Sequence, residues 1–220
     1  MAHRQAQWPA ALRCHALTPR GGPEGSGPFD ARLVSVASDR VTTVDNARFL
    51  ASPTPIVLHV LCTSLYGWLG AFQFSRGIRL RWPRWHRRAG RILAACGLMT
   101  GLSGLWMTAF YAIPTPHQGP LLVGVRLVVG AAMVLSVVLG VTSILRRDLV
   151  RHEAFMIRAY ALGMGSGTQA LVLGPWMLIT GESEGLTRDL LMTLAWGINV
   201  VVAEWLIARR NGQRPFGATR

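Results

Sequence analysis

The feature that most constrains this chain is a succession of five long apolar runs. They cover residues 56–74, 92–113, 121–145, 154–180 and 190–207. A helix needs roughly 17–25 residues of this kind to cross about 30 Å of hydrocarbon, and each run is close to that length. Buried helices of water-soluble proteins seldom reach this length five times in series. The sequence therefore predicts an all-α fold, a polytopic transmembrane helix bundle with five spanning helices.

The segment between the first two runs, residues 75–91, carries seven arginines and no acidic residue. Each arginine held at the centre of a bilayer costs about 2.5–3.5 kcal/mol, even on the mildest insertion scale. We therefore expect this segment to be a loop outside the hydrocarbon.

The arginine distribution also predicts the orientation of the chain. The connections after the first and third runs and the C-terminal tail hold seven, three and four arginines, whereas the two alternate connections hold none and one. Short positively charged connections stay in the cytoplasm. The sequence predicts that residues 75–91 and the C-terminus are cytoplasmic and, with five spans, that the N-terminus is outside.

Three regions follow from this hydropathy pattern. Residues 1–52 are hydrophilic and interrupted by Gly and Pro, which predicts a disordered N-terminal segment. Residues 53–208 form the predicted transmembrane domain, and residues 209–220 form a basic cytoplasmic tail. The predicted partner is the lipid bilayer, with association between copies of the chain left open.

The net charge of +13 comes from arginines in short connections rather than on one helix face. This distribution argues against nucleic-acid binding. The three cysteines, Cys14, Cys62 and Cys96, have neither the spacing of a zinc site nor that of a disulfide framework.

Ionisable residues at membrane depth are the candidate functional residues, because burying them in hydrocarbon is costly. They fall into two layers, with one near each membrane surface: His59 and Arg126 on the outer side, and His86, His152, Arg158 and Glu204 on the inner side. Arg158 lies about 7.5 Å into the fourth run, and the same rise places Glu204 at a similar depth in the fifth. We therefore expect these two side chains to form an ion pair.

Two layers of histidine are also typical of membrane cytochromes that hold b-type haem between helices. The four histidines that could serve are His59, His86, His117 and His152. His86 and His152 stand just before apolar runs, and His117 lies in a proline-rich turn, which fits paired axial ligands poorly. Haem binding with electron transfer across the membrane therefore remains an alternative function, and no cofactor is predicted.

No metal site is predicted, because His-x-x-x-His and Glu-x-x-His spacings are missing from the sequence. A metal-dependent membrane enzyme remains a second alternative, and the sequence favours a protein that is not an enzyme. We expect a structural or transport-related bundle. A transporter would show broken helices, and in the sequence only Gly174-Pro175 hints at a break.

Three sequence blocks resemble a known family. They are His59 with GAFQF (residues 70–74) and WHRRAGR (85–91), then RHEAFMIRAYAL (151–162), then AWGINVVVAEWLI (195–207). In this order the blocks resemble the bacterial predicted membrane proteins called domain of unknown function 2306. The resemblance implies a small multi-pass protein of the bacterial cytoplasmic (inner) membrane, without an assigned activity.

Overall fold

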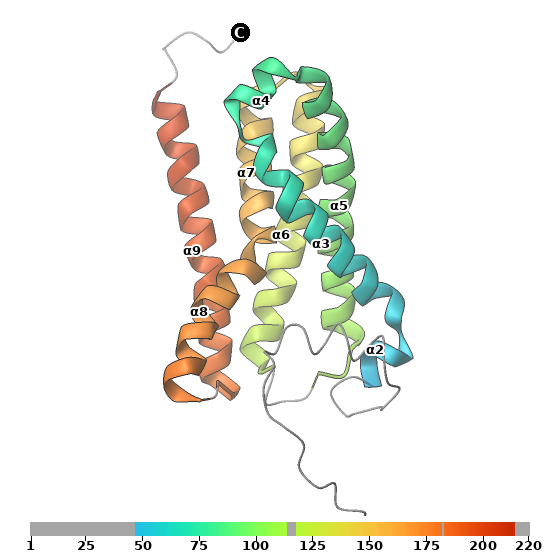
Figure 1. Ribbon diagram of the computed structural model, residues 1–220, viewed down its shortest axis with the longest axis vertical. Coiled ribbons are helices and arrows are strands. Elements are labelled where there is room, and N and C mark those ends of the chain that lie inside the picture. The colour runs from blue at the N-terminus through green and yellow to red at the C-terminus, as the bar shows by residue number, and fades with distance from the viewer. Residues whose placement is uncertain (1–46, 114–117, 182, 214–220) are drawn as a thin grey trace, which may run out of the picture. The chain divides into compact units, whose positions relative to one another are not determined.

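A computed structural model describes residues 47–113, 118–181 and 183–213. The chain divides into two units, residues 1–41 and 42–220, and all the described residues belong to the second unit. The described residues form helices and turns and contain no strand (Figure 1). The predicted all-α class is confirmed.

The described helices follow one another with short connections. They are α2 (Ala47–Ala51), α3 (Pro53–Gln73), α4 (Arg76–Arg81), α5 (Pro83–Phe110), α6 (Pro120–Leu145), α7 (Leu149–Gly163), α8 (Gly165–Thr180) and α9 (Gly185–Gly212).

Four of the described helices, α3, α5, α6 and α9, are long and apolar enough to cross a membrane. They correspond to the first, second, third and fifth predicted spans. The fourth predicted span needs a correction, because the structure divides it at Met164 into α7 and α8. Five segments therefore line the bundle, but one of them is broken.

The break has a local cause. Met164 is flanked by Gly163 and Gly165, and glycine weakens a helix interior by about 0.5–1 kcal/mol relative to alanine. The indole of Trp196 lies so close to Gly165 that any Cβ there would collide with it. The break does not fall at Gly174-Pro175, where the sequence offered its only hint of one, because α8 continues through Pro175.

The sequence predicted that residues 75–91 form a loop, and the structure corrects this prediction. Apart from Ser75 and Trp82, these residues belong to the helices α4 and α5. Ser75 caps α4, its Oγ accepting a hydrogen bond from the N–H of Ile78 at 3.5 Å. Pro83 then occupies the start of α5, a position that lacks a helical partner for its N–H in any case. Arginine is a good helix former, so the charges do not oppose this conformation.

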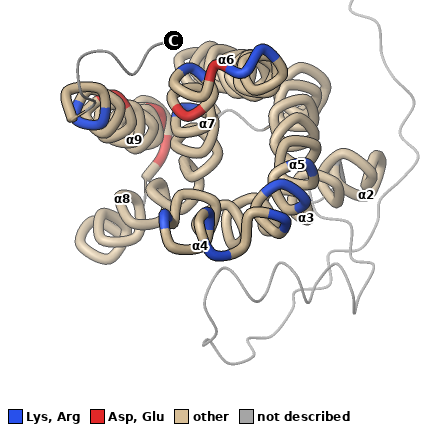
Figure 2. Tube along the Cα trace, turned by 90° about the horizontal axis from the view of Figure 1, so that it is seen from above, with Lys and Arg blue, Asp and Glu red and all other residues tan. Residues whose placement is uncertain are grey.

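The long helices run alternately up and down the bundle (Figure 1). Basic residues gather at one end of the bundle (Figure 2). This end is formed by α4, the first turns of α5 and α7, and the last turn of α9, and we call it the arginine-rich end. The starts of α3, α6 and α9 lie at the opposite end.

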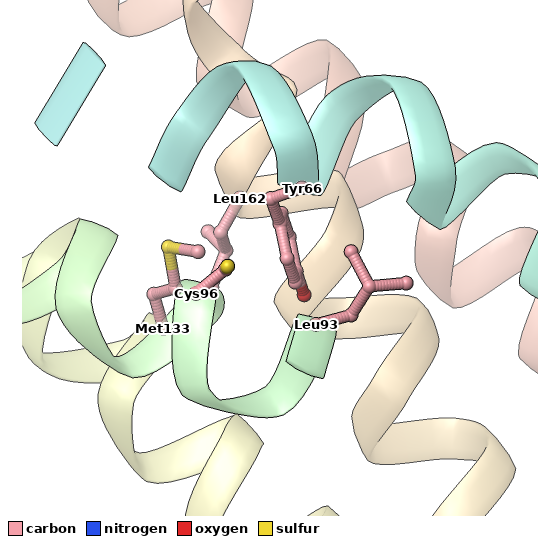
Figure 3. Packing of buried hydrophobic residues seen from close by; sticks show 5 residues of the cluster. All are labelled: Tyr66, Leu93, Cys96, Met133 and Leu162. Atoms are coloured by element: carbon pink, nitrogen blue, oxygen red, sulfur yellow. The ribbon is translucent and has the colours of Figure 1, made fainter. Parts of the chain in front are cut away.

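One buried cluster joins α3, α5, α6 and α7. It consists of Tyr66, Leu93, Cys96, Met133 and Leu162 (Figure 3). Gly97 faces this cluster, and a Cβ there would come within 2.9 Å of the Tyr66 ring. The absence of a side chain at Gly97 thus lets α3 and α5 pack closely.

Helix α9 is held at both ends by smaller clusters. Near the opposite end, Met192 packs with Leu122 of α6 and Leu173 of α8. Near the arginine-rich end, Ala203 and Ile207 pack with Ile157 of α7. The last helix therefore bridges both halves of the broken span.

The two terminal regions are only partly described. The disorder expected for residues 1–52 falls largely outside the described residues, although Ala47–Ala51 forms α2. The expected basic tail begins within a helix, because α9 continues to Gly212. Its remaining residues, from 214 onwards, lie outside the described part.

Candidate functional site

The break between α7 and α8 is the most unusual feature of the bundle. Met164 follows the 15 residues of α7, a rise of about 22 Å, and the 16 residues of α8 come after it. The break thus lies well inside the bundle. Non-helical backbone at membrane depth is tolerated only where it is buried in protein or lines a cavity.

At the break, some backbone N–H groups have no recorded backbone carbonyl as a hydrogen-bond partner. Met164 donates its N–H to Tyr160 O at 2.9 Å, and Thr168 donates to Met164 O at 3.2 Å. For the three N–H groups between them, of residues 165–167, the described structure records no backbone bond back to α7. On the acceptor side, Trp196 Nε1 donates to Leu162 O at 3.3 Å.

Two amide side chains add further donors. Thr168 Oγ1 donates to Asn199 Oδ1 at 2.8 Å, which links α8 to α9. The Nδ2 of Asn199 and the Nε2 of Gln169 are both buried without a hydrogen-bond partner among the described residues. Gln169 is only 9% exposed, and its side chain leans toward the first turn of α8, as helical side chains do.

A second polar group occupies the arginine-rich end. Glu153 at the start of α7 pairs with Arg79 of α4 at 3.6 Å and with Arg210 of α9. Beside it, His152 donates from Nδ1 to the carbonyl of Gly140 at 2.8 Å.

His86 approaches this group from α5. It interacts electrostatically with both Arg79 and His152, and its Nδ1 is buried without a partner in the described structure. Because α5 begins at Pro83, His86 lies within the first turn of a helix rather than before it. The two inner histidines therefore belong to the same polar group at the arginine-rich end, without a direct hydrogen bond between them in the described structure.

The predicted pair of Arg158 and Glu204 is confirmed. Arg158 Nε donates to Glu204 Oε1 at 2.5 Å and Nη2 donates to Oε2 at 2.8 Å, which is a bidentate geometry. The side chains are 36% and 48% exposed, so the pair lies on the outside of the bundle between α7 and α9.

The outer candidates do not meet in the described structure. His59 Nδ1 is bonded to Ser103 Oγ of α5 at 3.0 Å. Arg126 donates to Gln118, just before α6. His117 lies outside the described residues, so the outer half of a two-layer haem arrangement stays a prediction.

The sequence analysis missed Asp189. This residue is 1% exposed and accepts from the N–H of Gly119 at 3.0 Å and of Leu122 at 3.1 Å, capping α6 from α9. The sequence offered one indirect indication of this contact. Gly119-Pro120 stands at the start of α6, and neither residue has a side chain that could cap the helix. A helix end of this kind inside a membrane protein must be capped from elsewhere.

Among the residues that the structure describes, no group of three or more His, Cys, Asp or Glu side chains could hold a metal ion.

The fold defines an α-helical, multi-pass membrane protein with several apolar helices. The sequence model of the family described as predicted membrane protein (DUF2306) matches residues 56–207, and the chain belongs to that family. Comparison with curated proteins finds no match, and comparison with solved structures finds none.

Proposed function

We propose that this protein is a membrane transport protein and that the break between α7 and α8 is its solute site. The observation that carries the proposal is the interruption of the fourth span inside the bundle. Discontinuous helices of this kind form the substrate sites of many transporters, near the middle of the membrane. A purely structural bundle gains nothing from an interruption there.

The polarity of the break indicates the kind of solute. Among the described residues here, the backbone N–H groups of 165–167 lack a recorded backbone partner, and the side-chain NH₂ groups of Gln169 and Asn199 are buried without one; all of these groups are donors. The N-terminus of a helix also favours negative charge. The site therefore suits a small solute that offers acceptor oxygens, such as a carboxylate.

Cysteine accessibility tests the proposal on a background without native cysteines. Gln169→Cys places a thiol on the buried side of α8 beside the break, and Ile198→Cys places one on the exposed face of α9. Each lies one residue beyond the Thr168–Asn199 hydrogen bond, counted away from the arginine-rich end, so the depths match. The thiolate is the nucleophile that attacks thiol reagents, and it forms in water and not in hydrocarbon.

A transport pathway would let a water-soluble methanethiosulfonate modify Gln169→Cys in membranes much faster than Ile198→Cys. Equal resistance of both variants would leave a structural bundle and refute the solute site. Equal reactivity would show that this depth lies in water on every side.

We also propose that the protein lies in a bacterial cytoplasmic membrane, with its arginine-rich end in the cytoplasm and its N-terminus outside. The arginine distribution supports this orientation. In intact cells, an impermeant maleimide should label Gly181→Cys and leave Ser75→Cys unlabelled. The reverse pattern would show that the orientation is inverted.

A second function, haem binding with electron transfer, is favoured by one observation. His86 of α5 and His152 of α7 influence each other electrostatically, and the His152 Nδ1–H is already held by the carbonyl of Gly140. That bond leaves Nε2 to coordinate, as is usual for histidine ligands. Neighbouring arginines such as Arg79 could pair with the haem propionates.

Purified protein from haem-replete cells distinguishes this function from transport alone. A Soret band with sharp α and β bands after dithionite reduction, lost in both His86→Ala and His152→Ala, would establish a haem protein. A spectrum without a Soret band would remove the haem alternative.

A further inference from the structure

Three sulfur-bearing side chains meet in the middle of the bundle. Cys96 of α5 and Met133 of α6 belong to the central buried cluster, and Cys62 of α3 packs against it. Figure 3 shows both side chains in this cluster, with their sulfur atoms in yellow. The thiols of Cys62 and Cys96 are close enough to share a side-chain hydrogen bond.

The tertiary fold creates this cluster, because its members come from three different helices. Cys96 is 8% exposed and Met133 is 3% exposed, whereas Cys62 is half-buried. Cys62 is therefore the least buried of the three residues.

We propose that Cys62, Cys96 and Met133 form a binding site for a soft monovalent metal ion, Cu(I). Thiolate and thioether sulfur are the ligands that select Cu(I) over harder cations. Three sulfur donors from three helices also fit the low coordination number that this ion accepts. A zinc site would call for four ligands, usually including histidine or further cysteines.

The charge balance of the site supports one particular stoichiometry. When Cu(I) binds, one thiol loses its proton and forms a Cu–S bond, while the other thiol and the thioether donate as neutral ligands. The complex then carries no net charge. This matters because the cluster and its remaining neighbours, Leu69, Val129 and Ala132, offer no charged side chain to balance an ion.

The nearest competing ligand is already engaged. His59 lies three residues before Cys62 on the same face of α3. Its Nδ1 is bonded to Ser103 Oγ at 3.0 Å, which directs that nitrogen to α5. The three sulfur atoms thus form a set of their own. The site is independent of the proposed transport function.

Anaerobic titration tests the proposal. The full chain with Cys14→Ser, in detergent with ascorbate, competes for Cu(I) against bathocuproine disulfonate. We expect about one Cu(I) per chain. Cys96→Ser and Met133→Leu should each weaken binding by about tenfold or more, which is about 1.4 kcal/mol or more. Met192→Leu makes the same change in a different buried cluster and should leave the affinity unchanged.

A copper K-edge spectrum of the loaded protein without cluster substitutions checks the ligands even if a variant fails to fold. A first shell of sulfur only is expected. Nitrogen or oxygen in that shell, no binding in the titration, or equal loss in Met192→Leu and Met133→Leu would each overturn the proposal.

Discussion

Two carboxylates of α9 tie this helix to its neighbours in opposite ways. Asp189, in its first turn and 1% exposed, accepts hydrogen bonds from two backbone N–H groups of α6. Glu204, near the other end and 48% exposed, pairs with the side chain of Arg158. Asp189 accepts hydrogen bonds from the backbone N–H groups at the start of α6, whereas Glu204 neutralises the charge of an arginine side chain. The comparison teaches that a buried acid in a membrane protein need not imply a basic partner.

The largest effect should come from removing the buried carboxylate. Hydrogen bonds to a charged group contribute about 1.5–3 kcal/mol each, so Asp189→Ala should lower the free energy of unfolding by about 3–5 kcal/mol. Asp189→Asn keeps one acceptor oxygen and should lose roughly half as much. Unfolding of the purified protein in mixed micelles measures both. A loss below about 1 kcal/mol for Asp189→Ala would mean that water caps α6 equally well.

The next effect tests the closeness of the contact. A Cβ on Gly119 would collide with the Asp189 carboxylate, whereas a Cβ on Gly124, one turn into α6, would meet open space. Gly119→Ala should lower stability by about 1–3 kcal/mol through overpacking, and Gly124→Ala should leave it unchanged or raise it by about 0.5–1 kcal/mol. In an Asp189→Ala background most of the Gly119→Ala penalty should vanish. An equal penalty in both backgrounds would place the strain elsewhere.

The exposed pair should show a smaller coupling. Arg158→Met and Glu204→Gln, combined in a double-mutant cycle, should give a coupling energy of about 0.5–1 kcal/mol, the upper range for exposed ion pairs, because the geometry is bidentate. Strict additivity of the two substitutions would show that each side chain is stabilised separately by solvent or lipid headgroups.

The smallest effect distinguishes the two carboxylates by salt. Raising NaCl from about 0.1 M to about 1 M shortens the Debye length from about 10 Å to about 3 Å. The coupling between Arg158 and Glu204 should fall by a few tenths of a kcal/mol. The loss caused by Asp189→Ala should not change, because its carboxylate is buried against backbone. Equal salt dependence of both would remove the difference between the two sites.

The sequence predicted Arg158 and Glu204 because complementary charges at matching depth can be found by counting residues. It could not predict the partner of Asp189, since a backbone N–H has no side-chain identity. The missing cap at Gly119-Pro120 would have indicated that an acceptor was needed, but not which residue supplies it.

The helices themselves followed from hydropathy, but two of their limits did not. Hydropathy does not reveal the helix break at Met164, because glycine and methionine carry no charge and leave the run apolar on average. The position of the break depends on Trp196, which reaches Gly165 only in the folded bundle. Likewise, the Arg-rich residues 76–81 looked like loop because they are polar, although Ser75 caps them as a helix.

The meeting of Cys62 and Cys96 was also beyond the sequence. The two residues lie in different apolar runs and share no recognised spacing, so the sequence gives no reason to pair them. Antiparallel packing of α3 and α5 brings them to the same level of the bundle. Only tertiary structure could show that contact.

The bonds of α9 bear on how the protein is made. Synthesis proceeds from the N-terminus, so the backbone groups of Gly119 and Leu122 and the guanidinium of Arg158 all reach the membrane before their partners in α9 do. Until the last segment leaves the ribosome, the first turn of α6 remains uncapped and Arg158 remains without its acid. Helix α9, in turn, carries two acids that oppose its own insertion. Its entry is therefore best coupled to docking on α6 and α7, and a chain that ends before α9 would present unpaired polar groups for quality control to detect.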